Sequence, residues 1–190
     1  MEIAMTPPEV ALLKAFLKQT STYVEFGTGG STYLAASTVG TSVVSLDSSE
    51  AWLGQVAECC IKDELKIQPK LIFADIGPTG DWGRPTDPKK QHLWPNYYNK
   101  MWLEPASQNA DLYLIDGRFR VSCFMAALTH CRDDSVVLVH DFTSRPEYHI
   151  VREVAREFAA AGDLSAFIAG PNRDKEKLHT LLDKYAYNPA

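Results

Sequence analysis

Residues 22–32, Thr-Tyr-Val-Glu-Phe-Gly-Thr-Gly-Gly-Ser-Thr, constrain the fold of this chain more than any other segment. A short run of strand-forming residues stops at Gly27, and a helix-compatible run begins at Ser31. Strand, glycine turn and helix, in that order, build the ligand crevice at the carboxyl end of the first strand of an open α/β sheet. Glycine permits a positive φ and lets a ligand lie against bare backbone. The segment therefore predicts a ligand-binding loop.

The residues around this loop indicate the kind of ligand. The dinucleotide fingerprint G-x-G-x-x-G needs a third glycine where this chain has Thr32. Glu25 lies two residues before Gly27, where a carboxylate suits a cationic ligand better than a pyrophosphate. S-adenosylmethionine carries an amino group and a sulfonium and no phosphate, so it fits this loop better than a dinucleotide does.

Composition and charge exclude several classes of protein. The chain has 190 residues, 45% of them hydrophobic, and a formal net charge of −5, which suits one globular domain without nucleic-acid partners. No apolar run approaches the roughly 20 residues that span a bilayer, and the first residues do not resemble a signal peptide. We therefore expect a cytoplasmic protein with no membrane contact. We expect buried, reduced thiols at the four cysteines, Cys59, Cys60, Cys123 and Cys131.

Apolar runs that alternate with helical patterns predict an α/β fold over residues 1–190. We expect a doubly wound, Rossmann-like and mostly parallel sheet of six or seven strands, with helices on both faces. The runs expected as strands are 22–26, 41–47, 70–74, 111–115, 135–139 and 165–169. The segments expected as helices are 7–20, 31–37, 49–60, 121–130, 148–161 and 178–185.

One long segment, residues 77–108, interrupts this alternation. It holds three glycines and five prolines, and a long connection of this kind in a compact domain is usually functional. Its rings are spaced to lie on one face of a short helix: Trp94, Tyr97, Tyr98 and Trp102. We favour a lid, an acceptor-binding wall or a homodimer contact over simple packing in the core.

Each predicted strand that leads to the crevice ends in a polar residue: Glu25, Asp47, Asp75, Asp116 and the pair His140-Asp141. Asp47 follows Gly27 by 20 residues, the position from which a carboxylate binds a ribose diol. The alternative role for Asp47 is a helix cap, although Ser49 can already supply it.

The other strand ends have competing interpretations. Asp75 can accept from an adenine amino group or form a turn, and Asp116 can hold an ammonium group or a metal. His140 can act as a general base oriented by Asp141, or be a histidine satisfied by nearby backbone. Three arginines are candidates for an anionic substrate group, although solvated surface arginine is the more usual role: Arg118, Arg120 and Arg145.

These motifs resemble the class I S-adenosylmethionine-dependent methyltransferases. Residues 25–32 look like their first motif, 45–47 like the acidic end of their second strand, and 114–117 with 139–141 like the ends of strands four and five. The set is most similar to a subgroup that reads E-x-G-x-G-x-S-T, I-D-G-D-H and H-D. The resemblance covers residues 20–145. One departure is Arg118-Phe119, which stands where the subgroup carries Asp-His and removes an acid and a histidine from the crevice.

The resemblance implies a set of site residues. The residues expected to bind S-adenosylmethionine are Glu25, Gly27, Thr28, Gly29, Ser31, Asp47, Asp75 and Asp116. The expected catalytic residues are Asp116, His140 and Asp141, and we predict no metal ligands.

The implied reaction is transfer of a methyl group to a small-molecule acceptor. The sulfonium already makes the methyl electrophilic, so the protein mainly aligns the acceptor and, for a hydroxyl, removes a proton. Two alternatives stay open. One is a binding or scaffold protein that keeps the fold without turnover. The other is a nicotinamide-dependent oxidoreductase, which Thr32 and Glu25 disfavour.

Overall fold

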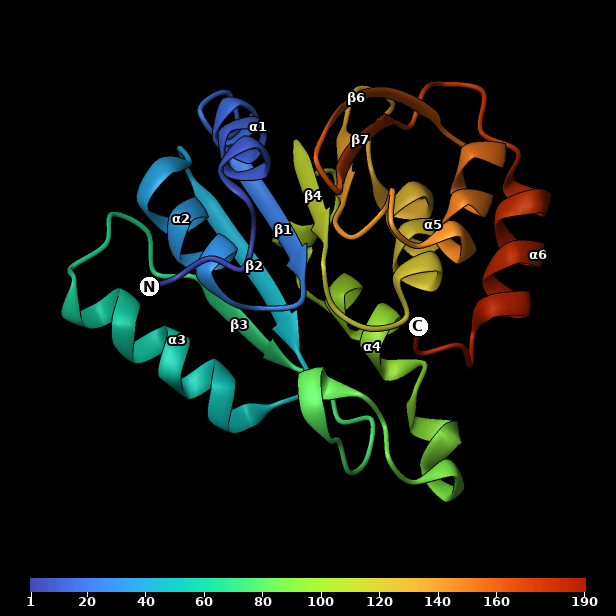
Figure 1. Cartoon of the computed structure of the whole chain (residues 1–190), viewed down its shortest axis with the longest axis horizontal. Helices are drawn as coiled ribbons and strands as arrows, with labels where there is room; N and C mark the ends of the chain where they lie inside the picture. Colours follow the sequence, from blue (N-terminus) through green and yellow to red (C-terminus); the bar gives the residue numbers. More distant parts are fainter.

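A seven-stranded sheet forms the centre of the computed structural model, which describes all 190 residues (Figure 1). Its strands are β1 (Thr22–Phe26), β2 (Ser42–Asp47), β3 (Lys70–Phe73), β4 (Leu112–Ile115), β5 (Val136–Val139), β6 (Arg156–Ala161) and β7 (Leu164–Ile168). They lie in the order β3-β2-β1-β4-β5-β7-β6, and β7 runs antiparallel to both of its neighbours. The strand order reverses between β1 and β4, where ligands bind in doubly wound sheets. The predicted fold class is confirmed.

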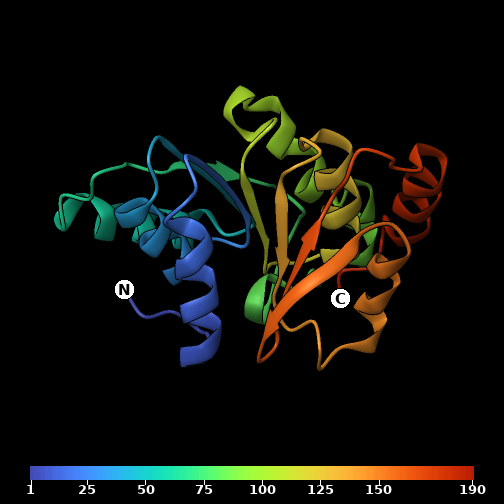
Figure 2. The same cartoon turned by 90° about the horizontal axis from the view of Figure 1, so that it is seen from above.

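Helices cover both faces of this sheet (Figures 1 and 2). The helices α1 (Pro7–Leu17), α2 (Gly30–Thr38) and α3 (Glu50–Lys62) pack on one face, and α4 (Asn96–Asn99), α5 (Arg120–His130) and α6 (Lys175–Tyr185) on the other. Because successive strand side chains point to opposite faces, β1 sends Tyr23 into one apolar cluster and Val24 into the other. No helix combines the length and the apolar character needed to cross a bilayer.

Local sequence explains where the first helices begin. Pro7 occupies the first turn of α1, and Glu9 Oε2 accepts a hydrogen bond from the N–H of Thr6 at 2.6 Å. Ser49 Oγ accepts from the N–H of Trp52 at 3.2 Å and caps α3. These contacts use side chains within three residues of the helix start, so the sequence predicts both helices.

The predicted helix over residues 148–161 is wrong. Residues Pro146–Glu153 form a 3₁₀ helix, η5, and Arg156–Ala161 form the edge strand β6. Gly162, at φ +57°, turns the chain so that β6 pairs with β7. The alanine-rich sequence favours a helix locally, but backbone pairing with β7 and packing of Phe158 on Phe16 of α1 favour the strand.

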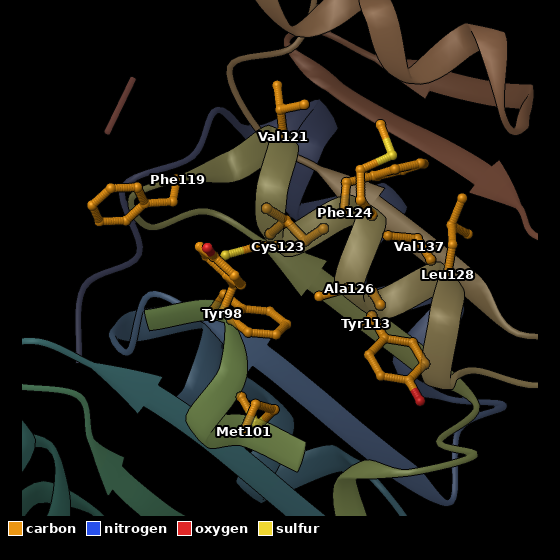
Figure 3. Packing of buried hydrophobic residues seen from close by; sticks show 14 of the residues in the cluster. Tyr98, Met101, Tyr113, Phe119, Val121, Cys123, Phe124, Ala126, Leu128 and Val137 are labelled. Carbon is orange, nitrogen blue, oxygen red and sulfur yellow. The ribbon is translucent and has the colours of Figure 1, made fainter. Parts of the chain in front are cut away.

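The segment 77–108 folds into five short helical pieces. Besides α4, these are η1 (Asp81–Gly83), η2 (Pro88–Leu93), η3 (Lys100–Leu103) and η4 (Pro105–Ser107). Figure 3 shows Tyr98 and Met101 from this segment pointing toward α5. Gly83 lies close to Ser48, since a Cβ on Gly83 would be 3.0 Å from Ser48 Oγ. The segment therefore reaches the carboxyl end of β2 at one point and enters the apolar core at another.

Trp94, Tyr97, Tyr98 and Trp102 belong to the core, whereas the fifth ring of this segment, Trp82, is 87% exposed. None of the four is more than 9% exposed. Trp102 stacks on His130 of α5 with ring centroids 4.3 Å apart, and Tyr97 lies 5.7 Å from Phe119. For these rings, the preference for a lid, an acceptor wall or a dimer contact over core packing is wrong, because α5 and the sheet provide apolar surface that covers them. A homodimer through other residues of the segment stays a prediction.

Truncating one of these rings should therefore reduce stability strongly. We expect Trp102→Ala to lower the free energy of unfolding by about 3–5 kcal/mol, since it leaves a cavity among buried rings. Urea denaturation measures the loss. Leu103→Ala is the control, because Leu103 is 79% exposed and its truncation should change the free energy by less than about 0.5 kcal/mol. Equal effects of the two substitutions would contradict the core assignment.

Candidate functional site

The loops after β1 and β4 meet at two glycines. Gly27 has φ +104°, and a Cβ on it would lie 2.6 Å from the backbone nitrogen of Gly117. A Cβ on Gly117 would overlap the hydroxyl of Tyr97, which comes from the 77–108 segment. Both positions thus require glycine for close approach. The contact brings the first and fourth strand-end motifs together, as the sequence predicts.

Unlike Gly27 and Gly117, Gly29 makes no close contact within the protein that would require a glycine. A Cβ at Gly29 would have no heavy atom within 4 Å, and the residue is extended, with φ 177°. At Gly30, by contrast, a Cβ would strike the backbone of Glu2 and Ile3. Gly29 is the N-cap of α2, so open space lies in front of the start of that helix. This space leaves room for a ligand to pack against the backbone at the helix start.

Glu25 lies beneath the glycine loop and is fully buried. Ser31 Oγ and Thr32 Oγ1 both donate hydrogen bonds to its carboxyl, and Thr32 Oγ1 also accepts from the N–H of Gly29 at 2.9 Å. Burial raises the pKa of Glu25 to about 8, so its protonated form predominates at neutral pH. The expectation that Glu25 faces a cationic ligand is wrong in this geometry, because the side chain points under the loop. Glu25 and Ser31 instead fix the first turn of α2.

Asp47 ties the end of β2 to the glycine loop. Its Oδ2 accepts from the N–H of Thr28 at 3.2 Å, and its Oδ1 accepts from the N–H of Ser49 at 2.9 Å. Burial raises the pKa of Asp47, although these backbone donors act in the opposite direction. The Thr28 hydroxyl points away from the loop surface to Ser45 Oγ, at 2.7 Å. Asp47 thus supports the start of α3, and each of its oxygens keeps a further lone pair for a ligand.

Asp75 is exposed at the end of β3 and forms a turn. Its Oδ1 accepts from the N–H of Gly77 at 2.9 Å, and its backbone carbonyl accepts from the Asn96 side chain at 2.8 Å. The turn interpretation of Asp75 is therefore the one seen in the structure. Its second carboxylate oxygen accepts no hydrogen bond from the protein.

Arg120 joins the ends of β4 and β5. This arginine is only 3% exposed, and it donates to the carbonyl oxygens of Asp116, Gly117 and His140. Its Nη2 also lies 3.3 Å from Asp116 Oδ1 and 3.0 Å from Asp141 Oδ2. The sequence marked Arg120 as a substrate-binding candidate, but in the structure its donors are used within the protein. A buried cation satisfied in this way stabilises the crevice floor.

His140 lies between two carboxylates. Its Nδ1 is 2.9 Å from Asp116 Oδ1, and its Nε2 is 3.5 Å from Glu9 Oε2. Burial opposes the charged form, but the hydrogen bond and charge of Asp116 outweigh it and raise the pKa of His140. Since both ring nitrogens face acids, neither is free to take a proton from an acceptor. The geometry favours a role in positioning Asp116 over the predicted role of general base.

Glu9 is the residue of this cluster that sequence reasoning missed. It is 3% exposed, and its Oε1 accepts from the N–H of Asp163 at 2.6 Å. Glu9 therefore links α1 to the β6–β7 turn as well as to His140. From the sequence, Glu9 is expected only to cap the first turn of α1. No neighbouring residue indicates that it contacts the residues that follow β4 and β5.

Asp116, His140 and Asp141 place ligand atoms within 4.8 Å of one another, which is close enough for a metal ion. The charges of the carboxylates are already balanced, however. Arg120 contacts both acids, and Arg145 Nη2 lies 2.9 Å from Asp141 Oδ2. A divalent cation would be repelled by two adjacent guanidinium groups. The cluster therefore does not fit a metal site.

Comparison with known proteins identifies structures of the same fold. No protein-family model matches the chain, and no curated protein shows significant sequence similarity to it. The crystal structure of a methyltransferase-like protein from Silicibacter pomeroyi superposes with a TM-score of 0.90 and 29% identity, over 99% of this chain and 98% of that one. The O-methyltransferase TomG from Streptomyces achromogenes, solved with S-adenosylmethionine, superposes with a TM-score of 0.60 and 15% identity, over 88% of this chain and 82% of that one. A methyltransferase from Geobacter sulfurreducens superposes with a TM-score of 0.56 and 13% identity, over 86% of this chain and 80% of that one.

The raised pKa of His140 predicts how its contribution to stability depends on pH. The charged ring binds Asp116 and Glu9 in the folded state, so this contribution is complete below the unfolded pKa of 6.5. It is lost as the pH rises above 6.5 through the higher folded pKa. We therefore expect the difference in unfolding free energy between the wild type and His140→Gln to shrink from pH 6 toward pH 9. A difference that grows with pH in denaturant titrations would show that the folded state prefers the neutral ring.

Proposed function

We propose, from the class I S-adenosylmethionine-dependent methyltransferase fold of this chain, that it binds S-adenosylmethionine and methylates a small-molecule acceptor. The neighbouring structures support this proposal, since they include a methyltransferase-like protein that aligns over nearly the whole chain and an O-methyltransferase solved with S-adenosylmethionine. The seven-stranded order with β7 antiparallel places the strand-end motifs around one crevice.

The observation that carries the proposal is the open position of Gly29. Gly27, Gly30 and Gly117 are each explained by a close contact within the protein, but Gly29 is not. Its N–H donates to Thr32, and its Cα faces open space at the start of α2. What distinguishes Gly29 from the equally open Gly54 is its place as the N-cap of α2, directly after the Gly27 loop, where a ligand can pack against the backbone.

The residues around Gly29 fit the parts of S-adenosylmethionine. The backbone of Gly27, Thr28 and Gly29 would line the methionine end, and Asp116 would pair with the ammonium group. Asp47 is held by the loop itself, through Thr28, in a position to accept from the ribose diol. The free oxygen of the exposed Asp75 would accept from the adenine amino group.

Methyl transfer needs alignment more than acid–base chemistry. The sulfonium supplies an electrophilic methyl group, and this chain's own residues hold the acceptor in line with it. His140 positions Asp116 through the 2.9 Å contact of Nδ1 with Oδ1.

A second candidate function is a binding or scaffold protein without turnover. The arrangement of the two central acids favours it: Arg120 contacts Asp116 and Asp141, and Arg145 contacts Asp141. Calorimetry with S-adenosylmethionine and S-adenosylhomocysteine, followed by radiolabelled methyl transfer into metabolite extracts, separates the two functions. Binding with transfer supports the enzyme, and binding of both ligands without transfer supports the scaffold.

Filling the open glycine position should remove cofactor binding. We expect Gly29→Val to lose measurable affinity for S-adenosylhomocysteine in calorimetry, while the folded structure persists because its Cβ meets no protein atom. The control is Gly54→Val on α3, where a Cβ also meets nothing, and it should bind normally. Normal binding by Gly29→Val would place the ligand elsewhere.

Asp47 should contribute directly to cofactor affinity. We expect Asp47→Ala to weaken S-adenosylhomocysteine binding by about 1–3 kcal/mol, since the ribose diol loses its acceptor. Because Asp47 also accepts from Ser49 N at the start of α3, Ser49→Ala serves as the control. That variant loses the α3 cap and should retain affinity. An unchanged dissociation constant for a folded Asp47→Ala protein would refute the ribose assignment.

A further inference from the structure

The charges at the centre of the crevice leave one arginine without an acid. Asp116 pairs with Arg120 and His140, and Asp141 pairs with Arg120 and Arg145. Arg118, directly after Gly117, makes no ion pair with any residue of the chain. Asp116 and Asp141 thus already have cationic partners. The positive charge of Arg118 is not neutralised by an acid of the chain.

The Nε atom of Arg118 is removed from water. The Arg118 side chain is partly buried, and its Nε atom is buried with no hydrogen-bond partner. Gly83 of η1 lies over its stem, since a Cβ on Gly83 would be 3.9 Å from Arg118 Cγ. Burial, and then the charge of Arg120, lowers the pKa of Arg118. A buried donor without a partner costs free energy, and an oxyanion at this point would satisfy it.

Arg145, the N-cap of η5, and Tyr148 within η5 pack together with Arg120. Arg145 donates to the hydroxyl of Tyr148 at 3.0 Å, and the guanidinium carbons of Arg120 and Arg145 lie 5.6 and 5.7 Å from the Tyr148 ring. The positive charge of Arg145 also acts on Arg118. Of the three arginines that follow β4 and β5, Arg120 and Arg145 have acidic partners and only the Arg118 side chain lacks a protein acceptor.

We propose that Arg118 binds a carboxylate or phosphate group on the methyl acceptor, so that the acceptor is an anion. This inference rests on the proposed function for the identity of the bound molecule. The planar guanidinium binds both oxyanions through paired N–H donors. Arg118 adjoins Gly83 of η1 and the β4 end, whereas the open position that fits the cofactor is at Gly29, at the start of α2. Whether the anion and the cofactor occupy separate positions is decided by the competition measurement below.

The test measures anion binding to the full chain directly. Inorganic phosphate and, separately, succinate are titrated into the wild type, Arg118→Met and Arg118→Lys at constant ionic strength, with thermal shift and calorimetry as readouts. S-adenosylhomocysteine binding is measured on the same proteins, with and without the anion. Arg156→Met is the matched control, because Arg156 is an exposed arginine on the edge strand β6 and makes no ion pair.

We expect Arg118→Met to weaken binding of the preferred anion about tenfold or more, since one charge-assisted pair is lost. Arg118→Lys should give an intermediate loss, because it keeps the charge without the planar fork. The Arg156→Met variant should bind the anion as the wild type does. Stronger binding of phosphate indicates a phosphorylated acceptor, and stronger binding of succinate a carboxylated one.

Three results would overturn the proposal. The first is that the wild type binds no anion, and the second is that both Arg118 variants bind the anion as the wild type does. The third is that S-adenosylhomocysteine displaces the anion and also binds more weakly to Arg118→Met. The last result would assign Arg118 to the carboxylate of the cofactor. If S-adenosylhomocysteine fails to bind any variant or the wild type while the anion binds through Arg118, the proposed function fails and the oxyanion site stands.

Discussion

The crevice depends on the buried guanidinium of Arg120. It binds three backbone carbonyl oxygens from the ends of β4 and β5 and lies beside the carboxylates of Asp116 and Asp141. Without this cation, two acids and three carbonyl groups at the sheet edge would lose a shared partner in a poorly solvated place. Arg120 therefore sets the positions of Asp116, Asp141 and the backbone of His140, and the chemistry of the crevice follows from those positions.

The fold also changes the protonation of Glu25 and His140: it favours the neutral form of the first and the charged form of the second. Burial raises the pKa of Glu25 to about 8, so a residue expected to be an anion is mainly neutral. Burial lowers the pKa of His140, but Asp116 and Asp141 outweigh it and raise the pKa, so a residue expected to be a neutral base is held toward its charged form. Both residues then act on their neighbours: Glu25 orients the hydroxyls of α2, and His140 orients Asp116.

The 77–108 segment connects the core to the crevice. Four of its five rings pack against α5 and the sheet, the exception being the exposed Trp82. The Tyr97 hydroxyl lies against Gly117, and Gly83 lies close to Ser48 and Arg118. Buried aromatic contacts fix the position of the segment beside Ser48 and Gly117, because packed rings tolerate little displacement. The segment thus holds Gly83 close to Arg118.

The sequence by itself determined the strands β1 to β5, the starts of α1, α2, α3 and α5, and the convergence of Gly27, Asp47, Asp116 and His140 at one edge. These depend on local apolar patterns, caps and glycine turns, and parallel strands bring their carboxyl ends together. Only the tertiary structure decided that Arg156–Ala161 is a strand, that Trp102 is core and that Glu9 reaches His140. Each of these outcomes depends on a partner in another element, such as β7, α5 or the end of β5. Contacts of this kind outweigh local propensity, and they leave no mark in the residues next to them along the chain.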